Sequence, residues 1–497
     1  MSKLGNPIRP TRMLQVLGDL SREPPLSALA RVFGPNTPPW KAVVGVVVAQ
    51  VVLAGLMVVD WRAPVAVVLG VGLVVLALRR PLVAVGLLIA GRLLSTGSMS
   101  FIRIGKVNIG LFEPVLFLAL AALAIHAITR KQPLLQKWPW RGPLLVLAGW
   151  QVLGLLWCHS LGGGIQELIA VGVIFETATV LLTYVRTYED FRVVVSAWLG
   201  AAVLIGLLAL TTDWTGVGEV KDTWEVAAGG GRETGLGQQP NWFAMNLMFI
   251  VLTAFGMAAV EERRWLRWLF VAAGFFVFVS QLRSGSRGGI YALAIGSGLV
   301  GLAHPIARKW VARFGVLAGL VFLGFWLFGE GGSTTKAVNR ILMNLGNTWG
   351  EDVREQNWVV CMEMFAETWG RGIGPGGYPE LVADYNWRIY DSIHKYPHGI
   401  FWGVMAHYGV VGLGLAGWLV VLVFRMSRDL VRWTRGTAVE VFAWTMPATM
   451  LGYALWSFVE FNFDDKPFWE FLALFTALYL FVRRRRESDG KLPELPA

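Results

Sequence analysis

The chain has 497 residues, of which 55% are hydrophobic and only 15% are charged, a composition that excludes an ordinary soluble domain. Apolar runs long enough to cross a bilayer recur from Lys41 to Val482 and predict an integral membrane protein. The formal net charge of +11 does not indicate a nucleic-acid partner, because the basic residues lie mainly in short loops between the apolar runs.

In chain order, residues 1–40 are polar, basic and rich in proline, which predicts a cytoplasmic N-terminal tail. Apolar segments occupy much of 41–328 and 398–482, and a basic cytoplasmic tail, 483–497, follows. We expect an all-α fold, a polytopic bundle of about 12 to 14 transmembrane helices. The expected spans, of which the short third one could be re-entrant, lie near 42–59, 63–78, 81–93, 111–128, 142–158, 165–185, 193–211, 240–260, 266–281, 287–303, 311–328, 399–424, 440–460 and 467–482.

Alternate loops between these segments are basic. All of them fall on one side if the N-terminus is inside, and the positive-inside rule assigns that side to the cytoplasm. The basic residues are Arg79, Arg80, Arg130, Lys131, Lys137, Arg141, Arg186, Arg192, Arg263, Arg264, Arg267, Arg308, Lys309, Arg313, Arg425, Arg428, Arg432, Arg435 and Arg483 to Arg486.

Three larger loops are expected on the opposite, outer side, near 94–110, 212–240 and 329–397. The last is too long for a simple connector. Its apolar periodicity predicts two amphipathic helices over the membrane face, Val338 to Trp349 and Val353 to Trp369, and a Gly-rich turn follows them.

Four arginines on the outer side break the charge pattern: Arg232, Arg283, Arg287 and Arg354. A guanidinium group matches phosphate oxygens in charge and geometry, so these residues are candidates for binding an anionic ligand. The alternative for Arg283 and Arg287 is contact with lipid headgroups or with helix-end carbonyls. The two arginines are four residues apart and would share one face if their turn were helical.

Polar residues at two expected helix starts are further candidates. Gln238 and Asn241 flank Pro240 and could either cap a helix or bind a ligand. His398 is expected at the outer mouth of a span, where an imidazole can act as a base or simply bond a backbone carbonyl. His394 is a second candidate, and His407 is either a packing residue or a second polar contact. No third ligand accompanies His394 and His398, so no metal site is expected.

The two cysteines, Cys158 and Cys361, both fall on the predicted outer side. A disulfide between them is possible there, and ordinary packing is the alternative.

In four separated segments the chain resembles the O-antigen ligase and O-antigen polymerase superfamily of polytopic bacterial membrane glycosyltransferases. The first segment is Arg232 to Ala244, with Pro240-Asn241 at a helix start, and the second is Ser286-Arg287-Gly288-Gly289. The remaining two are Arg354-x-x-x-Trp358 leading to Gly372-Ile-Gly374-Pro-Gly376, and His398 with Gly409 and Gly412. Together they span roughly residues 230 to 415.

This resemblance implies an inner-membrane enzyme of lipopolysaccharide or exopolysaccharide synthesis. It would move a glycan from an undecaprenyl-pyrophosphate-linked donor to a lipid or glycan acceptor at the periplasmic face, without metal or cofactor and with inversion. His398 would accept the acceptor's proton, Arg287 and Arg232 would bind the pyrophosphate, and Arg283, Arg354, Gln238, Asn241 and His394 would contact substrate. Ligase and polymerase both remain open, and a transporter or flippase for lipid-linked sugars is the alternative of another class.

Overall fold

The computed structural model describes residues 81–94, 102–104, 107–109, 116–117, 119–121, 123–124, 137–215, 240–328, 353–385, 397–458 and 466–488. The chain divides into two compact units, Met1–Leu76 and Ala77–Ala497, and every described residue belongs to the second. The predicted tail 1–40, the spans near 42–59 and 63–78 and the loop helix at 338–349 therefore lie outside the described residues, and so do most of 111–128 and of 212–240.

The described part of the second unit is almost entirely helical, as predicted. Each apolar segment predicted between 142 and 482 corresponds to one helix, and so does the short segment at 81–93. The helices are α5 (Pro81–Leu94), α7 (Arg141–Gly154), α8 (Leu161–Tyr184), α9 (Tyr188–Thr215), α11 (Pro240–Val260), α12 (Arg264–Arg283), α13 (Arg287–Ala303), α14 (Pro305–Phe328), α16 (Val353–Glu367), α17 (Tyr378–Leu381), the 3-10 helix η3 (Val382–Tyr385), α18 (Ile400–Trp433), α19 (Val439–Trp456) and α20 (Lys466–Glu487).

Five of these helices, α8, α9, α11, α12 and α18, are long and apolar enough to cross a membrane, and α13 is a shorter apolar helix. The protein is therefore a helical membrane protein with several spans. The predicted second loop helix is also present, because α16 occupies Val353–Glu367 and the Gly-rich turn follows its end.

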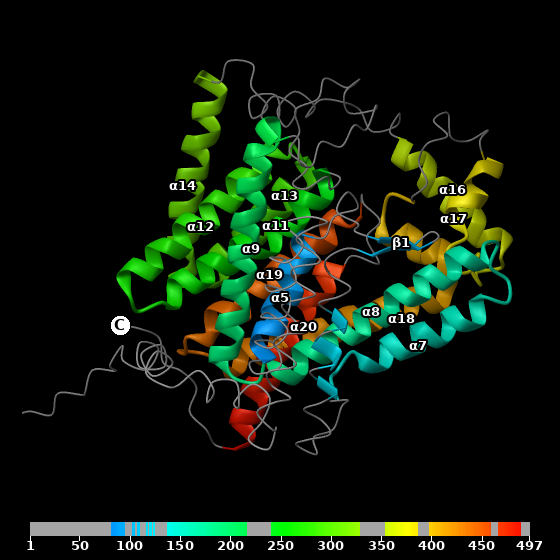
Figure 1. Ribbon diagram of the computed structural model, residues 1–497, viewed down its shortest axis with the longest axis horizontal. Coiled ribbons are helices and arrows are strands. Elements are labelled where there is room, and N and C mark those ends of the chain that lie inside the picture. Colours follow the sequence, from blue (N-terminus) through cyan, green and yellow to red (C-terminus); the bar gives the residue numbers. More distant parts are fainter. Residues whose placement is uncertain are drawn as a thin grey trace, which may run out of the picture. The chain divides into compact units, whose positions relative to one another are not determined.

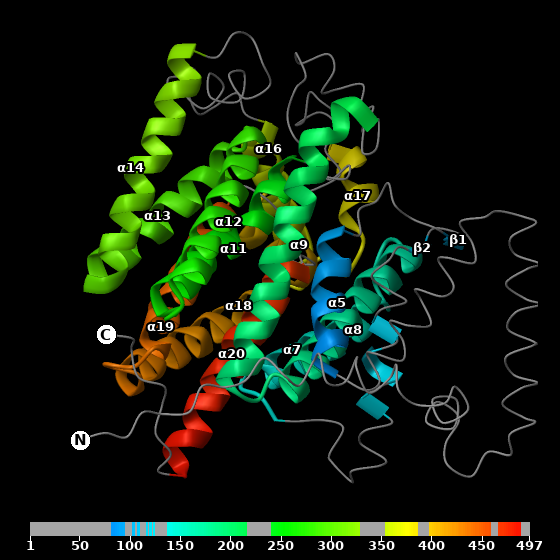
Figure 2. The same cartoon turned by 60° about the vertical axis from the view of Figure 1, so that its left-hand side comes forward.

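A short β-hairpin is an addition to the predicted all-α fold. Strands β1 (Ile102–Ile104) and β2 (Val107–Ile109) pair antiparallel within the stretch predicted as a loop near 94–110 (Figure 2). Apolar and polar residues alternate in both strands, and Gly105 and Lys106 separate them, which is the length of a two-residue hairpin connection. The segment is too short for this alternation to stand out from a loop.

Helix α11 forms the centre of the bundle, in contact with α9, α12, α13 and α19 (Figure 1). It is apolar on all sides, and 94% of an 18-residue apolar stretch within it is buried inside the protein. Neighbouring helices of the bundle approach closely at glycines. A β-carbon at Gly274 of α12 would lie 2.9 Å from Ala254 Cβ of α11, and one at Gly296 of α13 would lie 3.1 Å from the Ala448 carbonyl oxygen of α19. Small residues at helix contacts are typical of membrane bundles, where close packing replaces hydrophobic driving force.

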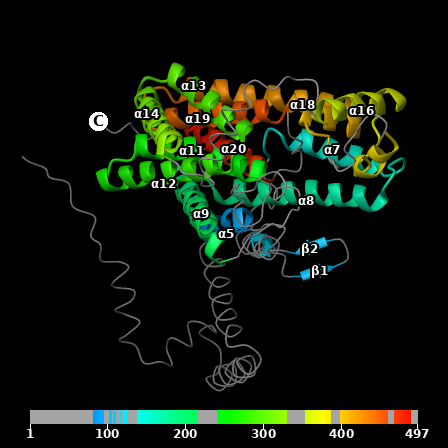
Figure 3. The same ribbon diagram turned by 90° about the horizontal axis from the view of Figure 1, so that it is seen from above.

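Helix α7 packs against both α8 and α18, and α16 packs on α18 (Figure 3). Helix α20 links this group to α11, because it contacts α8 as well as α9 and α11. Trp140 fixes part of this link by donating from its indole to Thr476 Oγ1 at 2.8 Å.

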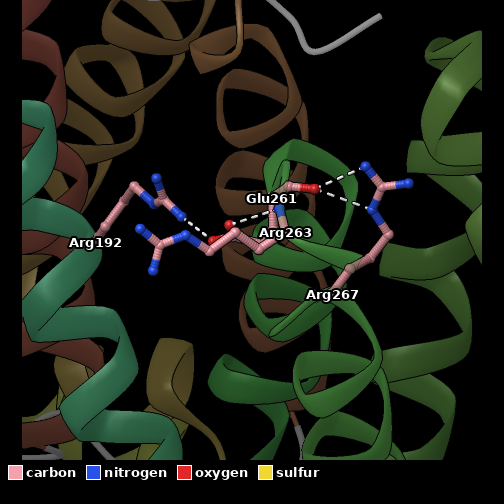
Figure 4. A network of polar contacts seen from close by, with 4 residues as sticks. All are labelled: Arg192, Glu261, Arg263 and Arg267. Atoms are coloured by element: carbon pink, nitrogen blue, oxygen red, sulfur yellow. Dashed lines mark hydrogen bonds and ion pairs between the residues drawn. The ribbon is translucent and has the colours of Figure 1, made fainter. Parts of the chain in front are cut away.

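Many of the loops predicted to be basic meet at one end of the bundle, here called the basic end. Arg192 of α9 forms an ion pair with Glu261, just beyond α11, and the Arg267 guanidinium donates to the Glu261 carbonyl at 2.7 and 2.9 Å (Figure 4). Arg484 of α20 donates to the Arg186 carbonyl at 3.2 Å. These contacts join the ends of α9, α11 and α12 and the ends of α8 and α20, at which predicted basic loops lie.

Helix α18 is broken at Gly409, which has φ 60° and ψ −148°. The span predicted near 399–424 is confirmed by this helix, but the break within it was not predicted. The backbone of the Gly-rich turn replaces the lost helical bonds: Ile373 N donates to Ala406 O at 2.9 Å, Gly374 N to His407 O at 3.0 Å, and Val410 N to Gly370 O at 2.9 Å. The turn after α16 therefore completes α18.

We expect Gly409→Ala to destabilise the protein. A β-carbon there would overlap the Gly370 carbonyl, and the positive φ disfavours any other residue. The expected cost is at least about 2 kcal/mol, seen as a lower melting temperature in detergent. Gly414→Ala in the same helix is the matched control, because a β-carbon at Gly414 meets nothing within 4 Å. It should gain up to about 1 kcal/mol from helix propensity. Equal melting temperatures for the two variants would contradict the role given to the break.

Candidate functional site

The candidate site lies at the end of the bundle opposite the basic end, here called the site end. His398 is half-buried just before α18 and has a positive φ of 46°, which is uncommon for a residue other than glycine. Trp358 of α16 holds it by donating from its indole Nε1 to the His398 carbonyl at 2.7 Å. The start of α18 is also tied to α19, because Ile400 N donates to Ser457 O at 2.7 Å.

The end of α19 connects His398 with the start of α13. A β-carbon at Gly288 would overlap the Trp456 indole, and Trp456 immediately precedes the Ser457 that bonds α18. Gly288 is the neighbour of Arg287. The segments that carry His398 and Arg287, which are more than a hundred residues apart, thus both contact the end of α19.

Arg283 and Arg287 flank a tight turn, Arg283 as the last residue of α12 and Arg287 as the first of α13. Gly285 has φ 63°, so the turn is not helical and the condition under which both arginines would share one helix face is not met. Other side chains build the turn: Ser284 Oγ donates to Gln281 O at 2.6 Å, Ser286 Oγ caps Gly289 N, and Gln281 Nε2 donates to Gly289 O at 3.0 Å.

The start of α11 lies against the same turn. Helix α11 begins at Pro240, as predicted, and a β-carbon at Gly289 would lie 2.9 Å from Ala244 Cβ. Asn241 is therefore within the first helical turn and half-buried at the site end. Arg232, Gln238 and His394 lie outside the described residues.

Arg354 lies one helical turn before Trp358 on α16. Helix α16 packs on α18 through the stacked rings of Trp358 and Trp402, whose centroids are 5.7 Å apart. Asn357, fully buried, accepts a hydrogen bond of 2.5 Å from the Tyr378 hydroxyl, which ties α16 to α17. Arg354 is therefore carried by the helix that holds His398.

The two cysteines do not form a disulfide; both are free thiols. Cys361 is buried next to Tyr378, and this burial raises the pKa of its thiol well above the usual range. The pKa of the Tyr378 hydroxyl is raised by burial as well. These groups stay neutral at physiological pH and serve packing and hydrogen bonding.

A polar cluster at the break in α18 was missed from the sequence, apart from the expectation that His407 makes either a packing or a second polar contact. His407 is 3% exposed, and its Nδ1 lies 3.1 Å from Glu167 Oε1 of α8. Tyr408 donates to Glu167 Oε2 at 2.5 Å and accepts from Gln151 Nε2 of α7 at 2.9 Å. The only available signal was a glutamate within an apolar span, because no spacing rule links residues 240 positions apart.

The arrangement places a histidine and several arginines near helix ends at one end of the bundle. Such a set can accept a proton and bind an anion. Within the described ranges no group of three or more His, Cys, Asp or Glu side chains could hold a metal ion.

No protein-family model matches the chain, and no curated protein matches it either. The likeness to the O-antigen ligase and polymerase superfamily therefore rests on its motifs, and the functional roles of the residues remain predictions.

We expect N-ethylmaleimide to modify Cys158, which is half-buried, and to spare Cys361 in the folded protein. Because burial raises the Cys361 pKa, raising the pH to about 9 should leave its thiol protonated and its labelling slow. Mass spectrometry of peptides from native and denatured protein checks this. Rapid labelling of Cys361 in the folded protein, or a disulfide-linked pair of cysteine peptides in the absence of reductant, would contradict this structure of the site end.

Proposed function

We propose that the protein is a membrane glycosyltransferase that moves a glycan from a polyprenyl-pyrophosphate carrier to an acceptor hydroxyl, in the manner of an O-antigen ligase. One observation carries the proposal: the segments that carry His398 and Arg287 are distant in the sequence, and both contact the end of α19 at one end of the bundle. A transfer of this kind requires both a base for the acceptor and fixed positive charge for the leaving pyrophosphate.

In the proposed reaction the acceptor hydroxyl attacks the anomeric carbon while His398 accepts its proton. The bond from that carbon to the pyrophosphate oxygen breaks, and the pyrophosphate leaves with the bonding electron pair. Arg287 and Arg232 stabilise the negative charge that develops on it, and Arg283 and Arg354 contact phosphate or glycan. A single direct displacement inverts the anomeric centre.

Two features support the inner membrane and the periplasmic face as the place of this reaction. The predicted basic loops that the structure describes cluster away from His398, and the positive-inside rule assigns such loops to the cytoplasm. A donor with a polyprenyl tail is confined to the bilayer, so a site at a helix end fits such a substrate.

Polymerase activity of the same superfamily is the second candidate, because the residues named do not distinguish a lipid acceptor from a growing glycan. A transporter or flippase is the rival of another class. The clustering of candidate residues at one end favours an enzyme, since transporters usually place their sites near the membrane midplane.

The first test uses purified protein, a polyprenyl-pyrophosphate-linked oligosaccharide and candidate acceptors. We expect transfer by the wild type and its loss in His398→Ala, with products followed by mass. One added glycan indicates a ligase, and a ladder of repeat units indicates a polymerase. Full transfer by His398→Ala would show that His398 is not the base. Absence of transfer, with movement of the lipid-linked sugar across proteoliposomes, would support the transporter instead.

We expect Arg287→Lys to lower turnover by about 100-fold or more, as loss of one oxyanion-hole donor does. Lysine keeps the charge but lacks the planar fork that binds two phosphate oxygens. Arg428→Lys is the matched control, because Arg428 is exposed and pairs with Asp429 in the basic part of α18. Initial rates at saturating donor provide the measurement. Normal turnover by Arg287→Lys would count against its pyrophosphate role.

A further inference from the structure

The polar cluster of Glu167, His407, Tyr408 and Gln151 has no part in the proposed chemistry. It lies where α7, α8 and α18 meet, beside the broken turn at Gly409. Polar and ionisable side chains inside a membrane bundle are expensive, and they are usually retained because they do something. The cluster therefore needs a purpose beyond packing.

Direct contact of His407 with a substrate does not fit its surroundings. The imidazole is 3% exposed and stacks on the Tyr378 ring, with centroids 6.1 Å apart. Glu167 approaches it at 3.1 Å and holds the next residue, Tyr408, by the hydroxyl. The effect of the cluster must therefore pass through other residues.

The same two residues are fixed through their backbones. Gly374 N donates to His407 O at 3.0 Å, and the Trp150 indole of α7 donates to Tyr408 O at 3.1 Å. These bonds satisfy the carbonyls but leave the direction of the helix before the break adjustable, because Gly409 has unusual freedom of φ and ψ. Glu167 adds a second attachment through the side chains of His407 and Tyr408. The two attachments together fix the direction of the helical segment before the break.

Two connections lead from the cluster to His398. The first is the helical segment 400–408 itself, which begins directly after His398 and Gly399. The second runs through Tyr378, which stacks on His407 and donates to Asn357 of α16 at 2.5 Å. Helix α16 then holds the His398 carbonyl through Trp358 at 2.7 Å.

We propose that Glu167 is a positioning residue for His398. Its carboxylate fixes His407 and Tyr408 at the break in α18 and so sets the direction of segment 400–408 and the position of the base. The inference rests on the proposed function, because it assumes that His398 is the base.

The test is Glu167→Gln, which keeps the size of the side chain and removes its charge. Glu176→Gln is the matched control, because Glu176 lies further along the same helix and no contact with His407 or Tyr408 is described for it. Misplacement of a catalytic group from a distance can cost up to about 100-fold, and we expect kcat of Glu167→Gln to fall by about 10-fold or more with donor KM unchanged. The control should match the wild type.

A double mutant separates positioning from general damage. If Glu167 acts through His398, adding Glu167→Gln to His398→Ala should not lower the residual rate further. An equal loss in both backgrounds, or wild-type kcat in Glu167→Gln, would overturn the inference. Tyr408→Phe removes one hydroxyl of the same cluster and provides the test should Glu167→Gln fail to fold.

A readout without turnover keeps this inference distinct from the proposed function. Diethyl pyrocarbonate modifies neutral imidazoles, and its rate at His398 can be compared with that at the exposed His159 by mass spectrometry. We expect His398 to react faster in Glu167→Gln, while His159 is unchanged. Unchanged reactivity of both histidines would refute the positioning even if the enzyme is active. Full activity of His398→Ala with a changed His398 reactivity would instead refute only the catalytic role.

Discussion

The break in α18 is the constraint on which the site end depends. With 34 residues, α18 would be about 51 Å long if it were straight, whereas α19, with 18 residues, is about 27 Å long. The two helices are joined at one end by a short connection and at the other by the bond from Ile400 to Ser457. A straight α18 cannot meet both conditions, so it has to bend.

Bending a helix inside a membrane protein leaves backbone groups that must find other partners. The Gly-rich turn supplies them, and this explains its composition. Gly372 and Gly374 have positive φ, and a β-carbon at Gly372 would lie 2.6 Å from the His407 carbonyl oxygen. The turn also packs on α7 and α8, where a β-carbon at Gly154 would lie 2.7 Å from Pro375. A single bend thus couples the loop after α16 to three helices.

The sequence predicted the helices well, because apolar length and charge alternation are local properties. Pro240 marked a helix start for a reason that operates within one turn. The bend at Gly409 was not predicted, since a glycine in an apolar helix is common and the reason for this one lies in the length of α19. The hairpin at 102–109 was missed because three residues a strand give too short an alternation.

The candidate site likewise has features that the sequence predicted and features that it did not. The arginine pattern pointed to Arg283 and Arg287, but whether the turn between them is helical depends on Gly285 and on the side chains of Gln281 and Ser284. The pairing of Glu167 with His407 depends on the packing of α8 and α18 against α7. Contacts over such separations follow from tertiary structure, which residue spacing alone does not determine.

The bend also bears on the choice between an enzyme and a transporter. In many transporters a broken helix exposes carbonyl groups near the midplane, and those carbonyls bind the transported ion or solute. Here the carbonyls of Ala406, His407 and Tyr408 accept bonds from Ile373 N, Gly374 N and the Trp150 indole. Groups already used in this way are poor ligands for a passing ion. The broken turn therefore fits a structural role in positioning His398 better than it fits a transport site.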